Sequence, residues 1–343
     1  MIRVFAVAAL LVLAGCGAVG WLLWAPYGGD RGPTRIELTR GARSRAIAEE
    51  LARAGVVRHP WIFLAARALR KGAVLQAGEY LFEKPATPLE VLDRLVRGDV
   101  IFYELAIPEG QNLFEIAQAA GRLPFLRADP FLAAARDPAL IRDLDPQAPT
   151  LEGYLFPDTY RITRQTTELD LCRQMVRRFR QVWAELKPTA DAHQIVTLAS
   201  LVEKEAAVGG ERPQVAGVFR NRLRLGMKLD CDPTTIYAAL LENRWTGVIH
   251  RSDLDNPHPY NTYRNPGLPP GPITNPGRAS LRAAIDPAVT DSLYFVAMPD
   301  GSGRHWFSKD LAAHETAVRK YRSGQAKVAQ TRTDQSPRLS SHP

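Results

Sequence analysis

The sequence predicts an α+β protein with an N-terminal transmembrane helix, a small α+β subdomain and a mainly helical domain that carries a short β-hairpin. Three observations predict this. Val4–Trp24 is apolar and uncharged, strands and helices alternate as far as about residue 122, and helical periodicity dominates from about residue 125. We therefore expect an anchor at 1–25, a linker at 26–33, an α+β module at 34–122, a helical domain at 123–325 and a disordered tail at 326–343.

The formal net charge of +8 is spread over both halves of the 343-residue chain. Such a charge suits nucleic acid, acidic polymers or a membrane surface. The sequence contains no recognisable nucleic-acid-binding module, so we do not expect nucleic acid as a partner.

The N-terminal apolar segment, Val4–Trp24, would span about 31 Å as a helix, which is enough to cross a bilayer. Arg3 precedes it, and Trp21 and Trp24 lie where an interfacial aromatic belt would be. Leu13-Ala-Gly-Cys16 inside it looks like a lipoprotein cleavage box, so lipidation of Cys16 is an alternative. The apolar run continues beyond Cys16, which favours an uncleaved anchor. Either interpretation places the rest of the chain outside the cytoplasm.

The α+β module contains a weak internal repeat. A shift of 69 residues superposes Gly41 on Gly110, Leu38 on Ile107 and Ile47 on Ile116, which is visible in the printed sequence. Each copy predicts a strand, a glycine turn and an amphipathic helix. Between the copies we expect a helix near 60–71, a strand at 79–82 and a helix near 88–97 that ends at Gly98. The module resembles the LysM glycan-binding fold; a packing module without a ligand is equally open.

The helical domain is predicted to contain helices near 168–186, 192–208, 211–225, 277–285 and 310–322. A strand pair at 293–298 and 305–308 flanks the turn Pro299-Asp-Gly-Ser-Gly303.

One carboxylate in this domain lies on an apolar helix face. At 100° per residue, Leu198, Leu201 and Val202 form a stripe, and Glu205 projects within about 20° of Leu198. Glu203 lies roughly 140° away. A buried carboxyl group that stays protonated near neutral pH can serve as a general acid. The alternative is a structural carboxylate that pairs with an arginine such as Arg222.

Three further segments combine hydrogen-bonding and aromatic side chains, which suits the polar edges and apolar faces of sugar rings. They are Leu151–Tyr160, the start of a helix at Asp232–Tyr237, and the proline-rich loop Tyr260–Pro276. Core packing, a helix cap and a rigid connection are the respective structural alternatives.

Metal and cofactor chemistry is not expected. No CxxC or HExxH spacing occurs, and His250, Asp253, Asp255 and His258 share a polar loop without a matching ligand pair elsewhere. Cys172 and Cys231 could pair, or they could be two unpaired apolar residues.

Several motifs occur in order along the chain: Glu152-Gly-Tyr-Leu-Phe-Pro-Asp-Thr-Tyr160, Ala199-Ser-Leu-Val-Glu-Lys-Glu205, Val218-Phe-Arg-Asn-Arg-Leu223, Asp232-Pro-Thr-Thr-Ile-Tyr237, Tyr260-Asn-Thr-Tyr263 and Gly267-Leu-Pro-Pro-Gly-Pro-Ile273. From the anchor to about residue 323, the sequence resembles the MltG (YceG-like) family of membrane-anchored endolytic murein transglycosylases.

The resemblance implies a LysM-like subdomain ahead of a helical catalytic domain, and a lyase that acts on peptidoglycan glycan strands in cell-wall biogenesis. It implies that Glu205 is the catalytic residue. It also implies a single-pass anchor in the bacterial cytoplasmic (inner) membrane, a catalytic domain on the periplasmic side, and peptidoglycan synthases as candidate partners. The candidate substrate-binding residues are Glu152, Tyr154, Asp158, Asn221, Asp232, Tyr237, Tyr260, Asn261 and Tyr263.

Two other functions stay open on the sequence alone. One is a muramidase that uses Glu205 with a second carboxylate, Glu152 or Asp232. The other is a non-catalytic glycan-binding scaffold of the cell-wall machinery.

Overall fold

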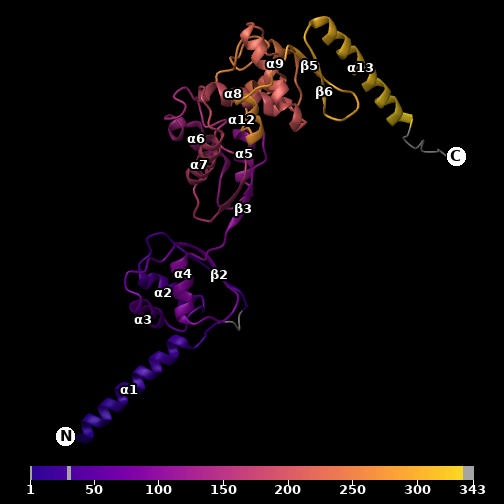
Figure 1. Ribbon diagram of the computed structural model, residues 1–343. Coiled ribbons are helices and arrows are strands. Elements are labelled where there is room, and N and C mark those ends of the chain that lie inside the picture. Colours follow the sequence, from indigo (N-terminus) through magenta and orange to yellow (C-terminus); the bar gives the residue numbers. More distant parts are fainter. Residues whose placement is uncertain (1, 29–31, 335–343) are drawn as a thin grey trace, which may run out of the picture. The chain divides into compact units, whose positions relative to one another are not determined.

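The computed structural model describes residues 2–28 and 32–334, with the backbone alone for 2–6, 8, 9, 11, 12, 16 and 325–334 (Figure 1). The chain forms two compact units. Unit 1 comprises residues 1–104 and 161–166, and unit 2 comprises residues 105–160 and 167–343. The fold is mixed but mainly helical, and the strands of the described residues form three two-stranded sheets.

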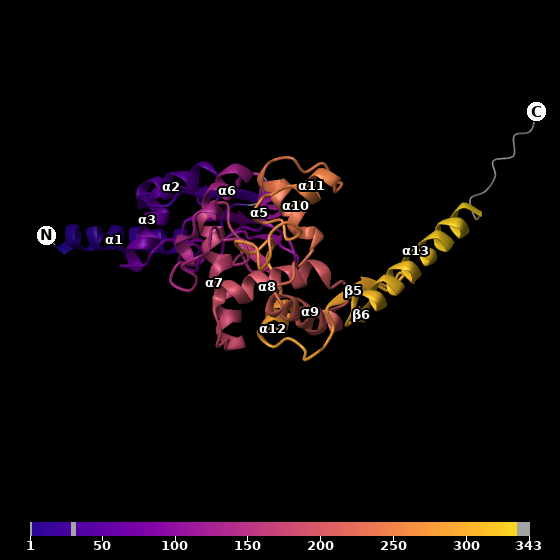
Figure 2. The ribbon, with the colours of Figure 1, turned by 90° about the horizontal axis from the view of Figure 1, so that it is seen from above.

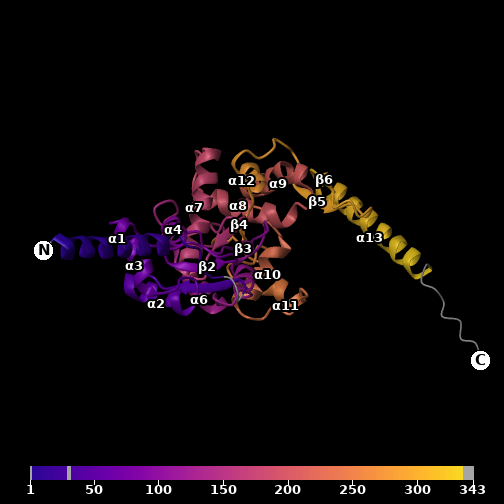
Figure 3. The same ribbon diagram turned by 90° about the horizontal axis from the view of Figure 1, so that it is seen from below.

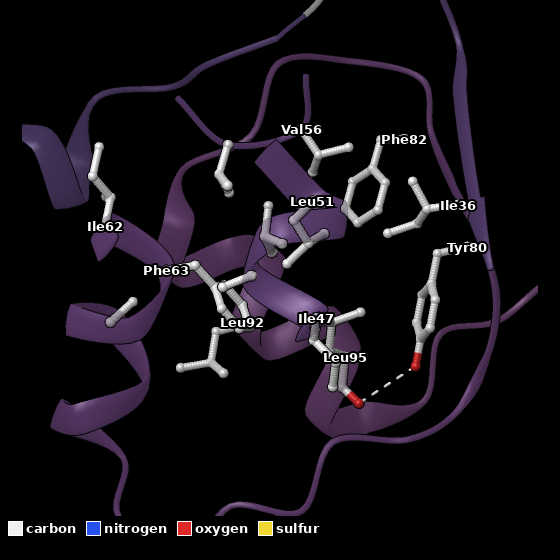
Figure 4. Packing of buried hydrophobic residues seen from close by; sticks show 14 of the residues in the cluster. Ile36, Ile47, Leu51, Val56, Ile62, Phe63, Tyr80, Phe82, Leu92 and Leu95 are labelled. Atoms are coloured by element: carbon white, nitrogen blue, oxygen red, sulfur yellow. Dashed lines mark hydrogen bonds between the residues drawn. The ribbon is translucent and has the colours of Figure 1, made fainter. Parts of the chain in front are cut away.

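Unit 1 is an α+β module built on one antiparallel strand pair. Its elements are α1 (Ile2–Trp24), β1 (Thr34–Leu38), α2 (Ser44–Arg53), α3 (Pro60–Leu69), β2 (Gly78–Phe82) and α4 (Pro88–Arg97). In the β1–β2 register Ile36 lies opposite Tyr80. Both side chains join Leu51, Phe63 and other apolar residues of α2–α4 in one core (Figure 4). The Tyr80 hydroxyl donates to the carbonyl of Leu95 at the edge of this core, at 3.5 Å.

The C-terminal end of α1 belongs to this module, because the side chain of Leu23 is only 8% exposed and lies in the same core. Trp21 and Trp24 are exposed. Among the residues searched, no helix is long and apolar enough to cross a membrane. Several side chains of the predicted span Val4–Trp24 lie outside the described set. The side chain of Cys16, the site of the alternative lipidation, is one of them. Both stay predictions.

Unit 2 is mainly helical. Its helices are α5 (Leu113–Ala120), α6 (Ala128–Arg136), α7 (Glu168–Leu186), α8 (Ala192–Glu205), α9 (Arg212–Arg224), α10 (Asp232–Leu241), α11 (Arg251–Asp255), α12 (Arg278–Ile285) and α13 (Leu311–Asp334), with 3₁₀ turns at Pro138–Leu140 and Gly209–Glu211. The predicted hairpin is present as β5 (Tyr294–Ala297) and β6 (His305–Ser308). The beginning of α13 packs against it (Figures 2 and 3).

The division between units differs from the predicted boundary at 122/123. The strand predicted at the start of the second repeat copy is present as β3 (Tyr103–Ala106). It pairs with β4 (Thr159–Ile162), a short strand that sequence reasoning missed, and each runs from one unit into the other. The helix α5 packs on α6 and therefore belongs to unit 2. The predicted repeat is real at the local level, since Gly41 and Gly110 both have φ of +79°. The helices of the two copies, α2 and α5, nevertheless belong to different units. Packing, and not local conformation, decides which unit a helix joins.

Two predicted helix ends were wrong. α8 ends at Glu205 instead of 208, because Ala206 is extended and the following Gly209-Gly210 pair disfavours helix. α13 continues to Asp334, beyond the predicted end near 322 and into the segment predicted to be disordered. Its Ala, Lys, Gln and Arg residues are good helix formers, which explains the extension. The remainder of the predicted tail, 335–343, lies outside the described residues.

Unit 2 positions the candidate site by surrounding α8. Residues 195–202 of this helix are all buried, and α8, α9 and α12 lie side by side (Figures 1 and 2). Part of the proline-rich loop, 271–277, is also buried. Ile273 of this loop donates its N–H to the Ser200 hydroxyl at 3.1 Å. The buried stripe predicted for α8 was thus too narrow, since residues 195–202 of this helix are covered on every side.

Candidate active site

Glu205 is the last residue of α8, and its side chain meets a pocket of about 660 Å³. The pocket is lined by residues from α8, α9, the start of α10, β5 and α13. Cys231 donates its thiol hydrogen to Glu205 Oε1, with an S–O distance of 3.1 Å. Among the described residues, the structure records no ion pair for Glu205. This carboxyl group therefore lies at an open pocket, without a neutralising partner in the part of the chain that the structure describes.

The pKa of Glu205 is raised, and the main cause is desolvation. The nearby charge of Asp232 raises it further, while the Cys231 thiol and the charges of His305 and Arg222 lower it. The position at the C-terminal end of α8 acts in the same direction as desolvation, because the helix dipole is negative there. The site therefore favours the protonated form of Glu205, which is the form that a general acid needs.

Glu203 shows how partners, rather than burial, distinguish the two acids of α8. Its side chain is only 5% exposed, although the helical wheel placed it away from the apolar stripe. Arg212 Nη2 donates to Glu203 Oε1 at 3.2 Å, and the N–H of Gly277 donates to Glu203 Oε2 at 2.8 Å. Glu203 is thus a charge-paired structural carboxylate. Glu205 has no comparable cation within hydrogen-bond distance among the residues described.

Asp232 and Tyr263 are the two predicted substrate-binding residues that line the same pocket as Glu205. Asp232 is the first residue of α10, and the Tyr263 hydroxyl donates to its Oδ1 at 2.7 Å. This hydrogen bond joins the proline-rich loop to the start of α10. The pocket therefore combines an acid with a raised pKa, a second acidic side chain and a phenol on one surface.

Arg222, Tyr294 and His314 also line the pocket, and sequence reasoning did not propose them as binding residues. The His314 ring stacks on Tyr294 with centroids 5.0 Å apart, and the guanidinium of Arg222 lies 5.1 Å from the centre of the Tyr294 ring. Arg222 donates to the carbonyls of Leu293 and Leu229, so it does not form the predicted alternative pair with Glu205. No local pattern could identify this stack, since its members come from three separate elements.

Glu152 does not line this pocket. Its side chain is buried, with the residue 1% exposed, and it accepts hydrogen bonds from Leu113 N–H at 2.9 Å and from Asn275 Nδ2 at 2.7 Å. The Tyr237 hydroxyl is a further partner. Asn275 also uses its Oδ1 to accept the N–H groups of Gly153 and Leu155, each at 2.9 Å. The Glu152–Asn275 pair therefore ties three distant segments of unit 2 together.

We expect Glu152 to make the protein less stable as the pH rises from about 5 to about 8. Desolvation raises its pKa to about 8, against about 4.3 in an unfolded chain. The stability that this group contributes is complete below the unfolded-state pKa and is lost as the pH rises through the folded-state value. Urea denaturation across this range measures the effect. Glu152→Gln cannot ionise and should give a flatter curve; parallel curves for the two proteins would contradict the assignment.

The other six candidate binding residues have partners inside the protein. Tyr154 donates to Asp145, Asp158 pairs with Arg178 at 2.7 Å, and Asn221 donates to the carbonyls of Thr290 and Ser292. Asn261 donates to two carbonyls of α11 and to that of Asn256. Tyr237 and Tyr260 pack together with ring centroids 5.1 Å apart. None of the six is among the residues that line the Glu205 pocket. The structure shows the partners that hold these side chains, and their role in substrate binding stays a prediction.

Cys172 and Cys231 are both free and buried, which answers the question of their pairing. Among the residues searched, no group of three or more His, Cys, Asp or Glu side chains is arranged to hold a metal ion. Asp253 was predicted to lie in a polar loop, but it is part of the short helix α11, where it pairs with Arg244 at 2.9 Å.

Comparison with known proteins adds a family to this geometry. Residues 36–320 match the family described as YceG-like. The chain is 32% identical to the endolytic murein transglycosylase of Bacillus subtilis (strain 168), over 91% of each protein. It is 31% identical to the endolytic murein transglycosylase of Streptococcus pneumoniae (serotype 2, strain D39), over 82% of this chain and 57% of that protein.

A solved structure is also similar. The 2.6 Å crystal structure of a yceG-like protein from Listeria monocytogenes superposes with a TM-score of 0.54 and is 31% identical in sequence. The match covers 83% of this chain and 98% of that one.

Proposed function

The chain belongs to the YceG-like family, and from this premise we propose that it is a lytic transglycosylase that cleaves the β-1,4 bond between N-acetylmuramic acid and N-acetylglucosamine within peptidoglycan glycan strands. The observation that carries the proposal is the desolvated carboxyl group of Glu205 at an open pocket, without an ion pair among the described residues. The names of the relatives, endolytic murein transglycosylases, support the same substrate and reaction.

In this mechanism one residue acts twice. Protonated Glu205 gives its proton to the glycosidic oxygen, and the bond from that oxygen to C1 of the muramyl residue breaks. The muramyl 6-hydroxyl then attacks C1, and its proton passes to the Glu205 carboxylate. The product carries a 1,6-anhydro end, no water is consumed, and Glu205 returns to its protonated form. A raised pKa of Glu205 suits both proton transfers, because the carboxyl group must give up a proton and then regain it.

The position of the enzyme in the cell is part of the proposal. We propose that α1 anchors the chain in the cytoplasmic membrane with unit 2 on the periplasmic side, and that unit 1 is a LysM-like module. The uncharged sequence of Val4–Trp24 supports the anchor, and the α+β order of unit 1 supports the module. Cleavage near the membrane would end newly made glycan strands, beside the synthases that extend them.

Product analysis tests the reaction type. Purified glycan strands are digested with the full-length protein, and the fragments are identified by mass spectrometry. We expect 1,6-anhydro ends, which lack one water relative to reducing ends. Reducing ends would instead indicate a two-carboxylate muramidase, for which Asp232 is the available second acid because it lines the same pocket. A protein that produces no fragments would be a scaffold.

A further inference from the structure

We propose that Cys231 is a positioning residue that holds the carboxyl group of Glu205 by Oε1 and leaves Oε2 free to exchange the proton with the substrate. The contact that carries the proposal is the thiol hydrogen bond to Oε1, with an S–O distance of 3.1 Å. The inference rests on the proposed role of Glu205. It adds a residue that no sequence motif identified.

Cys231 is well placed for this role because its own backbone is held on both sides. Its N–H donates to the Thr262 hydroxyl at 3.0 Å, and its carbonyl accepts from the Thr234 hydroxyl at 2.6 Å. The two threonine hydroxyls are 2.9 Å apart. The residue is 2% exposed, so water does not compete for its thiol. The thiol is therefore a fixed point from which one oxygen of Glu205 is oriented.

The chemistry of a thiol suits an acid that must stay protonated between turnovers. A thiol is a weaker hydrogen-bond donor than a hydroxyl, so it orients the carboxyl group without strongly favouring its ionised form. Burial and the neighbouring Glu205 raise the pKa of the Cys231 thiol well above its ordinary value. The thiol therefore remains a donor throughout the reaction. It gives its strongest hydrogen bond when Glu205 is a carboxylate, after the first proton transfer.

The pH dependence of this pair also depends on other charged groups. Asp232 from α10 raises the pKa of Glu205, while Arg222 from α9 and His305 from β6 lower it. The remaining titratable groups that line the pocket are Lys204, Asp230, Tyr263, Tyr294 and His314. Cys231 contributes to the raised pKa of Tyr263, but that pKa lies above its already high ordinary value. A change in the pH profile near neutral pH therefore reports on the pair of Glu205 and the thiol.

The test uses two substitutions that should shift the pH profile in opposite directions. Activity requires protonated Glu205, so kcat/KM falls as the pH rises above the pKa of that group. Cys231→Ser provides a stronger donor and should move this fall to lower pH. Cys231→Ala removes the donor, should move the fall to higher pH, and should lower kcat by about threefold to tenfold. Shifts in the same direction, or no shift, would overturn the proposal.

Cys172 offers a matched control, because it is also a free buried cysteine in unit 2 but does not line the pocket. Cys172→Ser should leave the pH profile unchanged, whatever it does to stability. If Cys231→Ala fails to fold, the serine variant still tests the predicted direction.

An infrared measurement of the S–H stretch of the full-length protein gives a second readout that does not depend on activity. Subtracting the spectrum of Cys231→Ser identifies the Cys231 band. We expect Glu205→Gln to change its frequency, since the acceptor of the thiol changes. An unchanged band would show that the contact is absent. If the unmodified protein forms no 1,6-anhydro ends, the proposed function fails. If Glu205→Gln keeps full activity, Glu205 loses its proposed role and this inference fails with it. If only the thiol results fail, the function stands without this inference.

Discussion

Glu205→Gln should reduce the formation of 1,6-anhydro ends by a factor on the order of 10² to 10⁴, because glutamine keeps the shape of the side chain but cannot donate or regain a proton. Folding should be unaffected or slightly improved near neutral pH. The raised pKa of Glu205 means that its ionised form destabilises the folded state, and the neutral amide removes that cost. The measurements are product yield by mass spectrometry and the midpoint of urea denaturation.

Glu203→Gln is the matched control, since both acids lie in the last turn of α8. Glu203 is paired with Arg212 and accepts from Gly277 N–H, so its substitution should lower stability. The folded fraction should still cleave glycan. Equal losses of activity in the two variants, after correction for the folded fraction, would remove the special role of Glu205.

Asn275→Ala should lower the free energy of unfolding by about 3–5 kcal/mol. The Asn275 side chain makes four hydrogen bonds, three of them buried and one, to Gln111 O, partly buried: it accepts from Gly153 and Leu155 N–H and donates to Gln111 O and Glu152 Oε1. Alanine leaves the N–H groups of Gly153 and Leu155 without this acceptor. It also removes one donor from Glu152 Oε1 and one from the Gln111 carbonyl, which still accepts the backbone N–H of residue 275 at 2.9 Å. Urea denaturation monitored by tryptophan fluorescence measures the loss.

The control for this substitution is Gln147→Ala, which removes an amide side chain from an exposed residue. It should change stability by no more than about 0.5 kcal/mol. A second variant, Asn275→Asp, keeps the acceptor but places a carboxyl oxygen against Glu152. Its stability should recover at low pH, where the two acids are protonated. A loss for Asn275→Ala no larger than that for Gln147→Ala would contradict the network.

Much of the local structure could be predicted from the sequence because its causes are local. The predicted bounds of α7 agree with the structure, and the hairpin β5–β6 lies where alternation and turn residues placed it. Gly41 and Gly110 adopt the left-handed conformation that the repeat required. Helix ends were less reliable. The position of Glu205 at the end of α8, which contributes to its electrostatics, was hidden by the longer predicted helix.

The candidate site shows where such reasoning stops. The helical wheel selected Glu205 over Glu203 by assuming one buried face, whereas residues 195–202 of α8 are covered on all sides and the side chain of Glu203 is nearly inaccessible. The difference lies in partners: Arg212 neutralises Glu203, whereas the hydrogen bond recorded for the Glu205 side chain within the described part of the chain comes from a thiol. Glu152 entered as a candidate for substrate binding, but distant Asn275 and Leu113 hold it inside the protein.

The sequence by itself determined the family, the mixed and mainly helical fold, and the acid on which the proposed chemistry rests. Only the tertiary structure decided which acids are neutralised, which residues share the pocket, and that Cys231 donates to Glu205. The physical reason is range. Helical and strand periods depend on a few neighbouring residues, whereas the pKa and orientation of a carboxyl group depend on donors and charges from distant segments that packing alone brings together.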